Sequence, residues 1–321
     1  MVVVRTGPRL HLGFQNLSLA RQRLYGGIGL AIDEPTVRIE AQRAGTVRAP
    51  SIVSDVANAA VELLSVPGAE IQVHESLDRH VGLGSGTQHA LATLTAIARA
   101  YDLDPAVRSR APSLGRGGRS GIGVATFESG GFVVDGGHPT EQFTTAPPEH
   151  GEWSVPPVIA CHTVPESWRF VVVVPDGVVG DHGASEDASM RTVVESADPA
   201  ISDTIATVVT HELLPAVASD SIEQFGQAIN AIGRLNGSWY AEQQGGVYRP
   251  PAGALITELK DCGALFGVGQ SSWGPAVYGL TSVEQTSRAL QAVEETLDSV
   301  GLEATVYCAK PRNTGAISTD R

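Results

Sequence analysis

The stretch Val81–Tyr101 holds the residues best suited to chemistry, because a glycine-rich turn there runs straight into an amphipathic helix. The turn consists of Gly82, Leu83, Gly84, Ser85, Gly86, Thr87 and Gln88. Glycines without a Cβ let backbone N–H groups approach a ligand, and the hydroxyl and amide side chains between them add donors. Apolar residues recur at helical spacing from Ala90 onward, so the turn lies at a helix N-terminus, which favours an anion. The pattern predicts a cradle for a phosphate or diphosphate.

The same glycines would also suit a tight turn before a buried helix, since a G-x-G-x-G pattern alone has little specificity. The turn is not a Walker A loop, because no Lys follows Gly86. It is not a Rossmann fingerprint either, because its third glycine comes too early. From this stretch alone, both the phosphate cradle and the structural turn stay open.

A second glycine concentration, residues 115–138, carries Arg116 and Arg119. Two arginines among glycines favour bidentate contacts to an anion, with a solvated surface charge as the alternative. Within this stretch, Val124–Phe127 and Phe132–Val134 are expected to be two strands of a hairpin, because the residues between them have turn composition.

The remaining periodicity predicts an α+β chain. Strands are expected at Val2–Val4, Arg9–Leu12, Thr36–Glu40, Ile71–His74, Trp168–Val174 and Thr305–Cys308, and helices at Ile52–Leu64, Ile201–Val217 and Ile222–Leu235. Ser221 and Gln224 have the spacing of a capping box before the last helix. The third glycine cluster, Gly263–Leu280, reads as strand, turn and strand, and a further helix ends at Gly301.

Residues 138–165 are rich in Pro, Glu and Thr with little periodicity, so a linker is expected there. It would separate an N-terminal domain, residues 1–160, from a C-terminal domain, residues 161–321. In the second half, strand, helix and strand recur, which suggests a ferredoxin-like layer.

Composition excludes several classes of function. The net charge of -13 and the lack of a basic stripe argue against nucleic acid as a partner. No apolar run is long enough for a membrane span, and no signal peptide is recognisable, so a cytoplasmic location is expected. The three cysteines share no metal spacing and are expected to be reduced thiols.

Blocks spread over nearly the whole chain resemble the GHMP kinase superfamily, and within it the family of β-ribofuranosylaminobenzene 5'-phosphate synthases. They are RLHLGF from Arg9, GGIGLA from Gly26, GLGSGTQ from Gly82, GRGGRSGIGVATFESGGFVVDGG from Gly115, QQGGVY from Gln243 and GQSSWGPAVYGL from Gly269. The resemblance implies a two-domain GHMP-kinase-like fold, with a βαβ-type N-terminal domain and a ferredoxin-like C-terminal domain.

The resemblance also implies a reaction and a cofactor. Members of the family condense 5-phosphoribosyl 1-diphosphate with 4-hydroxybenzoate or 4-aminobenzoate, release diphosphate and CO2, and serve tetrahydromethanopterin biosynthesis. A divalent cation, normally Mg²⁺, is expected with such a leaving group, and Asp135 is the candidate ligand, with a turn residue as its alternative. A homodimer is the default expectation for such an enzyme.

Roles for individual residues follow from the resemblance as hypotheses. The turn 82–88 would hold diphosphate; Arg9, His11 and Arg119 are the catalytic candidates, with Arg9 and His11 positioning the aromatic acid or moving its proton. Phosphate or the benzoate carboxylate would be bound by Arg116, Arg119, Ser120 and Gly121. The substrate would also be contacted by Gly26, Gly27, Gln270, Ser271, Ser272 and Trp273. His11 as a structural group and Trp273 as interface filler are the alternatives.

Two other functions stay open. Mevalonate-type kinases carry Asp in a Ser-Gly-x-Asp frame after the second glycine loop, whereas this chain has Gly123 there, and its two lysines lie at positions 260 and 310. A glycine takes no proton, so an ATP-dependent small-molecule kinase would need a relocated acid, for example Glu128 or Asp33. A non-catalytic sensor of a phosphorylated ligand is the other alternative.

Overall fold

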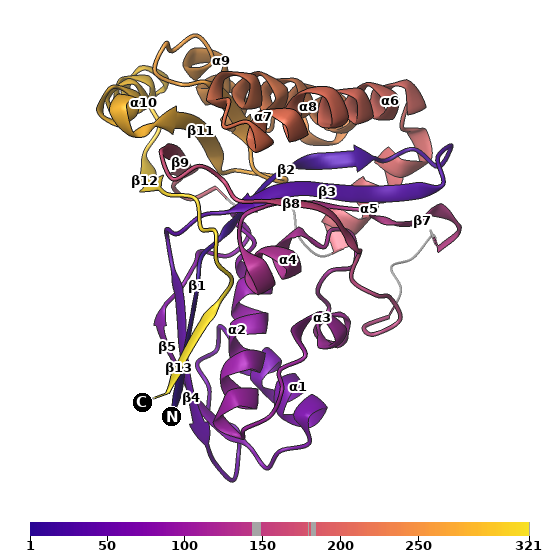
Figure 1. The fold of residues 1–321 in the computed structure, drawn as a ribbon, viewed down its shortest axis with the longest axis vertical. Helices are drawn as coiled ribbons and strands as arrows, with labels where there is room; N and C mark the ends of the chain where they lie inside the picture. Colours follow the sequence, from indigo (N-terminus) through magenta and orange to yellow (C-terminus); the bar gives the residue numbers. More distant parts are fainter. Residues whose placement is uncertain (143–148, 179, 181–183, 321) are drawn as a thin grey trace.

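The computed structural model of the chain describes residues 1–142, 149–178, 180 and 184–320. Within these ranges the strands form three sheets, and the molecule has two lobes that meet near β2 and β3 (Figure 1). Every pair of strands in these sheets is antiparallel, and helices cover the sheets, so the α+β prediction is confirmed. Among the described helices, none combines the length and apolar character that a bilayer crossing needs.

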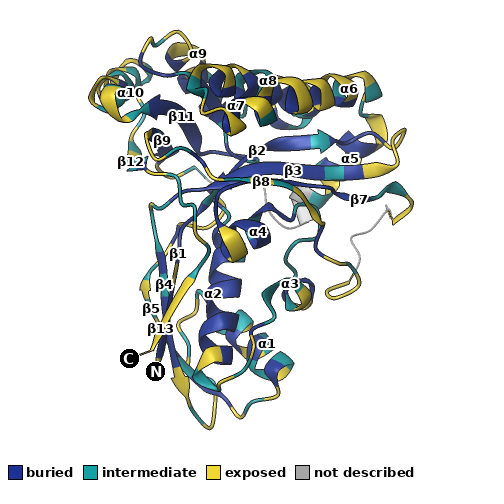
Figure 2. Cartoon of the chain, viewed as in Figure 1, coloured by how far each residue is buried: buried dark blue, intermediate teal, exposed yellow. Residues whose placement is uncertain are grey.

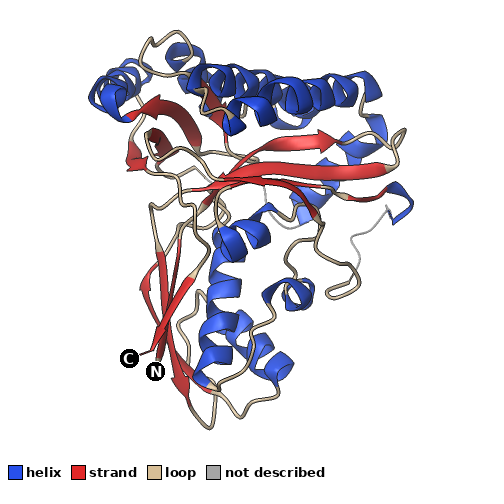
Figure 3. Ribbon diagram, in the orientation of Figure 1, coloured by secondary structure: helices blue, strands red, loops and turns tan. Residues whose placement is uncertain are grey.

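The first sheet has the strand order β13-β1-β4-β5. Its strands are β1 (Val2–Thr6), β4 (Val37–Arg43), β5 (Ala69–Glu75) and β13 (Ile317–Asp320). Helices α1 (Ser54–Leu64) and α2 (Ser85–Ala100) lie against it, followed by α3 (Val107–Arg110) and η1 (Pro112–Leu114) (Figure 3). Almost all of α2 is buried (Figure 2), so packing on several sides fixes where its N-terminus lies.

The second sheet joins the lobes, with the order β2-β3-β6-β8 and β7 beside β3. Its strands are β2 (Arg9–Asn16), β3 (Arg23–Ala31), β6 (Phe132–Asp135), β7 (His138–Pro139) and β8 (Val158–His162), and η2 (Thr140–Gln142) follows β7. The β2–β3 register shifts between His11 and Gly13, which marks a bulge in β2.

The third sheet has the order β10-β11-β9-β12. Its strands are β9 (Trp168–Pro175), β10 (Gly267–Gln270), β11 (Val277–Ser282) and β12 (Ala304–Ala309). The helices of this half are α5 (Ala184–Ser196), α6 (Pro199–Val208), η3 (Val209–Leu213), α7 (Leu214–Ala218), α8 (Ile222–Gln244), α9 (Ala252–Leu259), η4 (Val283–Gln285) and α10 (Thr286–Val300). One side of the sheet packs on α9 and α10, and the other faces a core shared with α6, α8 and the second sheet.

The hairpin expected around residues 128–131 is wrong. Residues 122–129 form helix α4 (Ile122–Ser129), and only the second expected strand exists, as β6. The apolar run is short and contains β-branched residues, which local pattern alone does not assign. Packing decides: Ile122 lies against Gly29 of β3, where an added Cβ would come within 2.6 Å of Ile122 Cγ2.

The linker expected at residues 138–165 is also wrong in part, because β7 and β8 lie there and β8 pairs with β6. Residues 143–148 of that stretch lie outside the described residues. Its low periodicity reflects a strand at a sheet edge, where the pattern of burial is weak. The domain boundary expected after residue 160 falls inside β8 and stays a prediction.

The helices of the second half begin close to their expected residues. The segment expected at Ile201–Val217 is the continuous run of α6, η3 and α7. Helix α8 is longer than expected, since it continues past Leu235 to Gln244 and stops at the left-handed Gly245. Its N-terminal Ser221 makes no side-chain capping bond, so the capping box is not formed. Gly301 ends α10 in the left-handed conformation, as predicted.

Candidate active site

The glycine-rich turn lies where the sequence places it, immediately before α2. Gly84 is the N-cap residue, with φ 77°, and Gly82 has φ 89°. A Cβ on Gly82 would lie 2.4 Å from the Ser271 carbonyl oxygen, so the third glycine cluster touches the turn directly. Both positions therefore need glycine for their backbone conformation, and Gly82 needs it for space as well.

The residues of the turn divide into a buried group, which includes Ser85, and a partly exposed group. Leu83 and Gln88 point into the interior: Leu83 belongs to the core, and the Gln88 amide accepts from Thr6 Oγ1 at 2.9 Å and donates to the Gly123 carbonyl at 3.0 Å. Gly86 and Thr87 remain partly exposed. A ligand at this turn would therefore meet mainly its backbone and its partly exposed members.

Two guanidinium groups flank the turn. Arg9 Nη1 donates to the Gly82 carbonyl at 2.7 Å, and the Arg9 side chain covers Gly84. Arg116 covers Gly86, where an added Cβ would lie 2.9 Å from Arg116 Nη1. The site thus places two cations at the positive end of a helix.

Of the two guanidinium groups, that of Arg116 has the less compensated charge. Its Nε is buried without a hydrogen-bond partner, and none of the described acidic side chains forms an ion pair with it. Burial lowers the pKa of Arg116, and the nearby Arg79 lowers it further. A buried cation beside a helix N-terminus is unfavourable in the absence of an anion.

Arg119 lies elsewhere. Its guanidinium pairs with Asp187 of α5, and it also contacts Tyr25, opposing the rise that burial causes in the Tyr25 pKa. The structure therefore gives Arg119 an acidic partner, unlike Arg116, although the two are three residues apart.

His11 of β2 is 4% exposed and makes contacts on two sides. Its Nε2 lies 3.1 Å from Ser120 Oγ, and its backbone N–H donates to Ser271 Oγ at 3.1 Å. Burial, with a smaller contribution from Arg9, holds the pKa of His11 well below its usual range, so the imidazole is neutral near pH 7.

Asp135 does not fit the expected role of metal ligand. The carboxyl group is 0% exposed, and its two oxygens accept N–H groups from Gly121 at 2.7 Å and Gly137 at 2.9 Å. Ser120 Oγ lies 3.4 Å from the first of these oxygens. In the described part of the chain, no three His, Cys, Asp or Glu side chains gather in a way that could hold a metal ion.

Gly26 and Gly27 serve close packing at this point of β3. A Cβ on Gly27 would lie 2.3 Å from Ser120 Oγ and 2.8 Å from Asp135 Oδ2, and Gly26 has φ 77°. The sequence assigned them to substrate, a role that stays a prediction.

The third glycine cluster joins the turn to β2. Ser271 is fully buried, and its Oγ donates to the Gly82 carbonyl at 2.7 Å while accepting from the His11 backbone. Ser272 has φ 57°, and its N–H donates to the His11 carbonyl at 3.0 Å. The Gln270 amide accepts from the Arg249 backbone at 2.8 Å. These contacts fix the turn, β2 and the third sheet in one arrangement.

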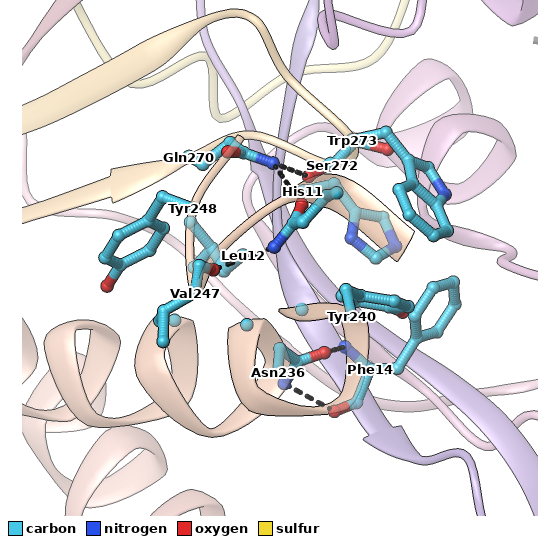
Figure 4. A pocket seen from close by; sticks show the side chains of 14 residues that line it. His11, Leu12, Phe14, Asn236, Tyr240, Val247, Tyr248, Gln270, Ser272 and Trp273 are labelled. Atoms are coloured by element: carbon cyan, nitrogen blue, oxygen red, sulfur yellow. Dashed lines mark hydrogen bonds between the residues drawn. The ribbon is translucent and has the colours of Figure 1, made fainter. Parts of the chain in front are cut away.

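A pocket opens between β2 and α8 (Figure 4). It is lined by residues 11–14 of β2, by Gly233, Asn236, Gly237, Tyr240 and Gln244 of α8, and by Val247, Tyr248, Gln270, Ser272 and Trp273. The rings of Tyr240 and Trp273 pack with centroids 4.4 Å apart, and those of His11 and Phe14 with centroids 4.8 Å apart. Among these lining residues there is no Asp, Glu, Lys or Arg, so the pocket suits a flat, weakly charged group.

Sequence reasoning missed the contribution of α8. Asn236 binds β2 at its bulge: its amide accepts from the Phe14 N–H at 2.7 Å and donates to the Phe14 carbonyl at 3.1 Å. Asn236 and Tyr240 lie beyond the expected end of this helix. The QQGGVY block was a usable signal, since Gln244, Val247 and Tyr248 line the pocket, but it carried no assigned role.

The fold and these contacts define a class of protein. Residues 51–131 match the GHMP kinases N terminal domain, and residues 213–299 match GHMP kinases C terminal. A homoserine kinase from Cytophaga hutchinsonii has a TM-score of 0.67 at 18% identity, covering 99% of this chain and 97% of that chain. The Methanococcus jannaschii mevalonate kinase has a TM-score of 0.64 at 14% identity, covering 97% and 98%. At such identities the likeness shows the fold alone, which is the GHMP kinase fold.

Sequence relatives narrow the class. The β-ribofuranosylphenol 5'-phosphate synthase of Archaeoglobus fulgidus is 33% identical, over 98% of each chain. The protein of the same name from Methanothermobacter thermautotrophicus is 32% identical, over 92% of each. The chain belongs to the family of β-ribofuranosylphenol 5'-phosphate synthases, and it is an enzyme of the pentosyltransferase class.

Proposed function

We propose that the enzyme condenses 5-phosphoribosyl 1-diphosphate with a para-substituted benzoate, releasing diphosphate and CO2. The relatives are named for a ribofuranosylphenol phosphate product, which favours 4-hydroxybenzoate over 4-aminobenzoate as the acceptor. The observation that carries the proposal is Arg116, a largely buried guanidinium with no acidic partner among the described residues, held over Gly86 at the start of α2. A diphosphate supplies the missing negative charge.

The glycine turn and the pocket, which both contact β2, suit the two substrates. We assign the diphosphate to the turn 82–88, with Arg9 and Arg116 beside it, and the aromatic ring to the pocket between β2 and α8. Departure of diphosphate leaves an oxocarbenium-like ribose carbon, and the turn stabilises the charge that develops on the leaving group. The ring carbon that bears the carboxylate attacks that ribose carbon. The bond to the carboxylate then breaks, CO2 leaves, and the bonding electrons restore the aromatic ring.

The described residues that line the pocket include no Lys or Arg, which supports the decarboxylation. A carboxylate that is paired with Arg or Lys is stabilised as an anion, whereas a carboxylate among aromatic side chains loses hydration without that compensation. Loss of neutral CO2 relieves this cost.

The kinase alternative is less well supported. Gly123, which replaces the acid of the kinase frame, packs against Thr87, with an added Cβ 3.1 Å from Thr87 Cγ2. Of the two relocated acids considered, Glu128 pairs with Arg108, and one carboxylate oxygen of Asp33 accepts the Lys310 backbone N–H. Both acids therefore already have partners in the fold.

Mg²⁺ remains part of the proposal, but Asp135 is no longer the candidate ligand, because both of its oxygens already accept backbone N–H groups. Titrating activity with Mg²⁺ after chelation tests whether the cation is required. The homodimer and the cytoplasmic location likewise stay predictions, and light scattering of the purified protein tests the first.

The deciding experiment combines purified protein, 5-phosphoribosyl 1-diphosphate, Mg²⁺ and carboxyl-labelled 4-hydroxybenzoate, with 4-aminobenzoate in parallel. Equal amounts of released CO2 and diphosphate are expected. Diphosphate without CO2 would contradict the proposed acceptor chemistry. Phosphorylation from ATP would establish a kinase, and ligand-dependent thermal stabilisation without any turnover would establish a sensor.

A further inference from the structure

Three polar side chains from separate parts of the chain form a line beneath the site, in which His11 and Asp135 are buried and Ser120 is partly exposed. His11 lies on β2, Ser120 lies just before α4, and Asp135 ends β6. Ser120 Oγ is 3.1 Å from His11 Nε2 and 3.4 Å from Asp135 Oδ2. The glycine at position 27 leaves the space in which Ser120 and Asp135 meet.

The direction of these hydrogen bonds follows from the partners of Asp135. Burial raises the pKa of Asp135, and the backbone N–H groups of Gly121 and Gly137, one at each oxygen, oppose this rise and favour the ionised carboxylate. A carboxylate only accepts hydrogen bonds. In the 3.4 Å contact between Ser120 Oγ and Asp135 Oδ2, the Ser120 hydroxyl is therefore the donor.

Ser120 Oγ then has only acceptor capacity left. Its oxygen also lies 3.3 Å from the Ile122 N–H, which can only donate. With its single proton directed at Asp135 and one lone pair facing Ile122, the oxygen offers a lone pair to His11. His11 Nε2 must carry a hydrogen to complete this contact.

We propose that Asp135 and Ser120 hold His11 in the Nε2–H tautomer, so that Nδ1 is the hydrogen-bond acceptor that the imidazole offers to a hydroxyl group of the substrate. This inference rests on the proposed function for the identity of the substrate. Asp135 and Ser120 act as positioning residues, because they reach the site through His11. Only His11 of the three lines the pocket (Figure 4).

With a neutral acceptor at His11, different residues of the site recognise the hydroxyl groups and the anionic groups of the substrates. An imidazolium would attract the substrate carboxylate or a phosphate, whereas a lone pair on Nδ1 selects an O–H donor and repels an anion. Both substrates carry hydroxyl groups, on the ribose and on the acceptor ring. The anionic groups are left to Arg9 and Arg116.

Nitrogen NMR on protein with ¹⁵N-labelled histidine tests the tautomer directly. The His11 signals are identified by their loss in His11→Gln. We expect a pyrrole-type Nε2 and a pyridine-type Nδ1 near pH 7 in the free enzyme. The reverse pattern, or two pyrrole-type signals from an imidazolium, would overturn the proposal. This readout needs no turnover, so it stands apart from the assay of the proposed function.

Adding one substrate at a time then identifies the donor. The Nδ1 signal is expected to move with 5-phosphoribosyl 1-diphosphate if the ribose hydroxyl binds, or with 4-hydroxybenzoate if the phenolic hydroxyl binds. If Nδ1 moves with neither substrate nor with both together, His11 accepts no substrate hydroxyl and the proposal is wrong.

Variants of Ser120 and Asp135 test whether these residues position His11 or only fill space. Ser120→Ala is expected to give averaged signals from both tautomers, and Asp135→Asn to favour Nδ1–H, because an amide can donate to Ser120 and turn its proton towards His11. Each is expected to lower kcat about 100-fold with little change in the KM for 5-phosphoribosyl 1-diphosphate. Ser129→Ala, which removes a hydroxyl bonded only to the α4 backbone and to Gly130, is the matched control. If Ser120→Ala keeps the wild-type tautomer, the proposal fails even if Asp135→Asn does not fold.

Discussion

The glycine turn 82–88 and the pocket between β2 and α8 differ in charge. On the side of the glycine turn, Arg9 and Arg116 flank the positive end of α2, whereas the pocket on the α8 side has no charged side chain among its lining residues. Both sides share His11 and the cluster 270–273. Under the proposed function, the enzyme holds the leaving anion with cations and keeps those cations away from the carboxylate that must leave as CO2.

Removing the unpaired cation should have the largest effect. Arg116→Ala is expected to lower kcat/KM about 100- to 1,000-fold, because the developing charge on diphosphate loses a preorganised partner. Arg116→Lys should recover only part of this, since a point charge lacks the fork of the guanidinium. Steady-state kinetics and calorimetric titration with diphosphate measure both effects.

The exposed Arg21, which pairs with Asp203 on the surface, supplies the control for charge alone. Arg21→Ala should leave kcat/KM unchanged. If Arg116→Ala also kept full activity, the cationic side would not be the diphosphate site.

A side chain added at Gly82 of the turn should have the next largest effect. Gly82→Ala puts a Cβ 2.4 Å from the Ser271 carbonyl oxygen at a residue with φ 89°. We expect the free energy of unfolding to fall by about 1–2 kcal/mol and diphosphate affinity to fall at least about tenfold. Gly45→Ala, with no atom within 4 Å of the new Cβ, is the control. Wild-type diphosphate affinity in Gly82→Ala would contradict the assigned cradle.

A substitution in the uncharged pocket should weaken binding of the aromatic substrate and leave diphosphate binding intact. Trp273→Leu should raise the KM for 4-hydroxybenzoate about three- to tenfold, because it removes an aromatic contact to the proposed ring site. Diphosphate affinity should stay unchanged, which makes the two substrates internal controls for each other. A loss confined to diphosphate binding would reverse the assignment of the two sides.

A further prediction concerns the pH dependence of stability, which involves no substrate. His89 of α2 has a pKa lowered to about 4 by burial and by the nearby Arg79 and Arg116. Between about pH 4 and pH 6.5, His89 binds a proton more readily in the unfolded chain than in the folded protein. The free energy of unfolding should therefore rise with pH in this range, by at most about 1.4 kcal/mol per pH unit. His89→Gln should flatten this slope in urea titrations.

Bound diphosphate should raise the pKa of His89, because it offsets the charge of Arg116. Titration of the His89 resonance by NMR, with and without diphosphate, checks this. An unchanged His89 pKa would mean that the anion binds away from α2.

The sequence predicted the parts of the site that depend on local chemistry. Gly82 and Gly84 require positive φ before a helix, and this pattern is legible from residue types alone. Arg119 and Arg116 look equivalent in the sequence, yet only packing against α5 gives Arg119 the partner Asp187. Likewise, Asp135 precedes two glycines in a way that suits a turn or a metal, and only the fold brings Ser120 and Gly121 against it.

The errors have a common physical origin. Residues 122–129 and 236–244 take their conformation from what they pack on: β3 for α4, and the bulged strand β2 for the end of α8. Contacts this distant along the chain leave little trace in local periodicity. The same holds for β13, which extended the first sheet although no strand was expected after residue 308.

Pairing of β13 with β1 bears on how the chain is made. Val2 pairs with Asp320, so β1 leaves the ribosome long before one of its two neighbours exists. Until β13 is synthesised, that side of β1 is an open edge that another nascent chain could extend. Productive folding of this lobe is therefore expected to depend on delay or chaperone protection during translation, and on a loop closure between residues 2 and 320.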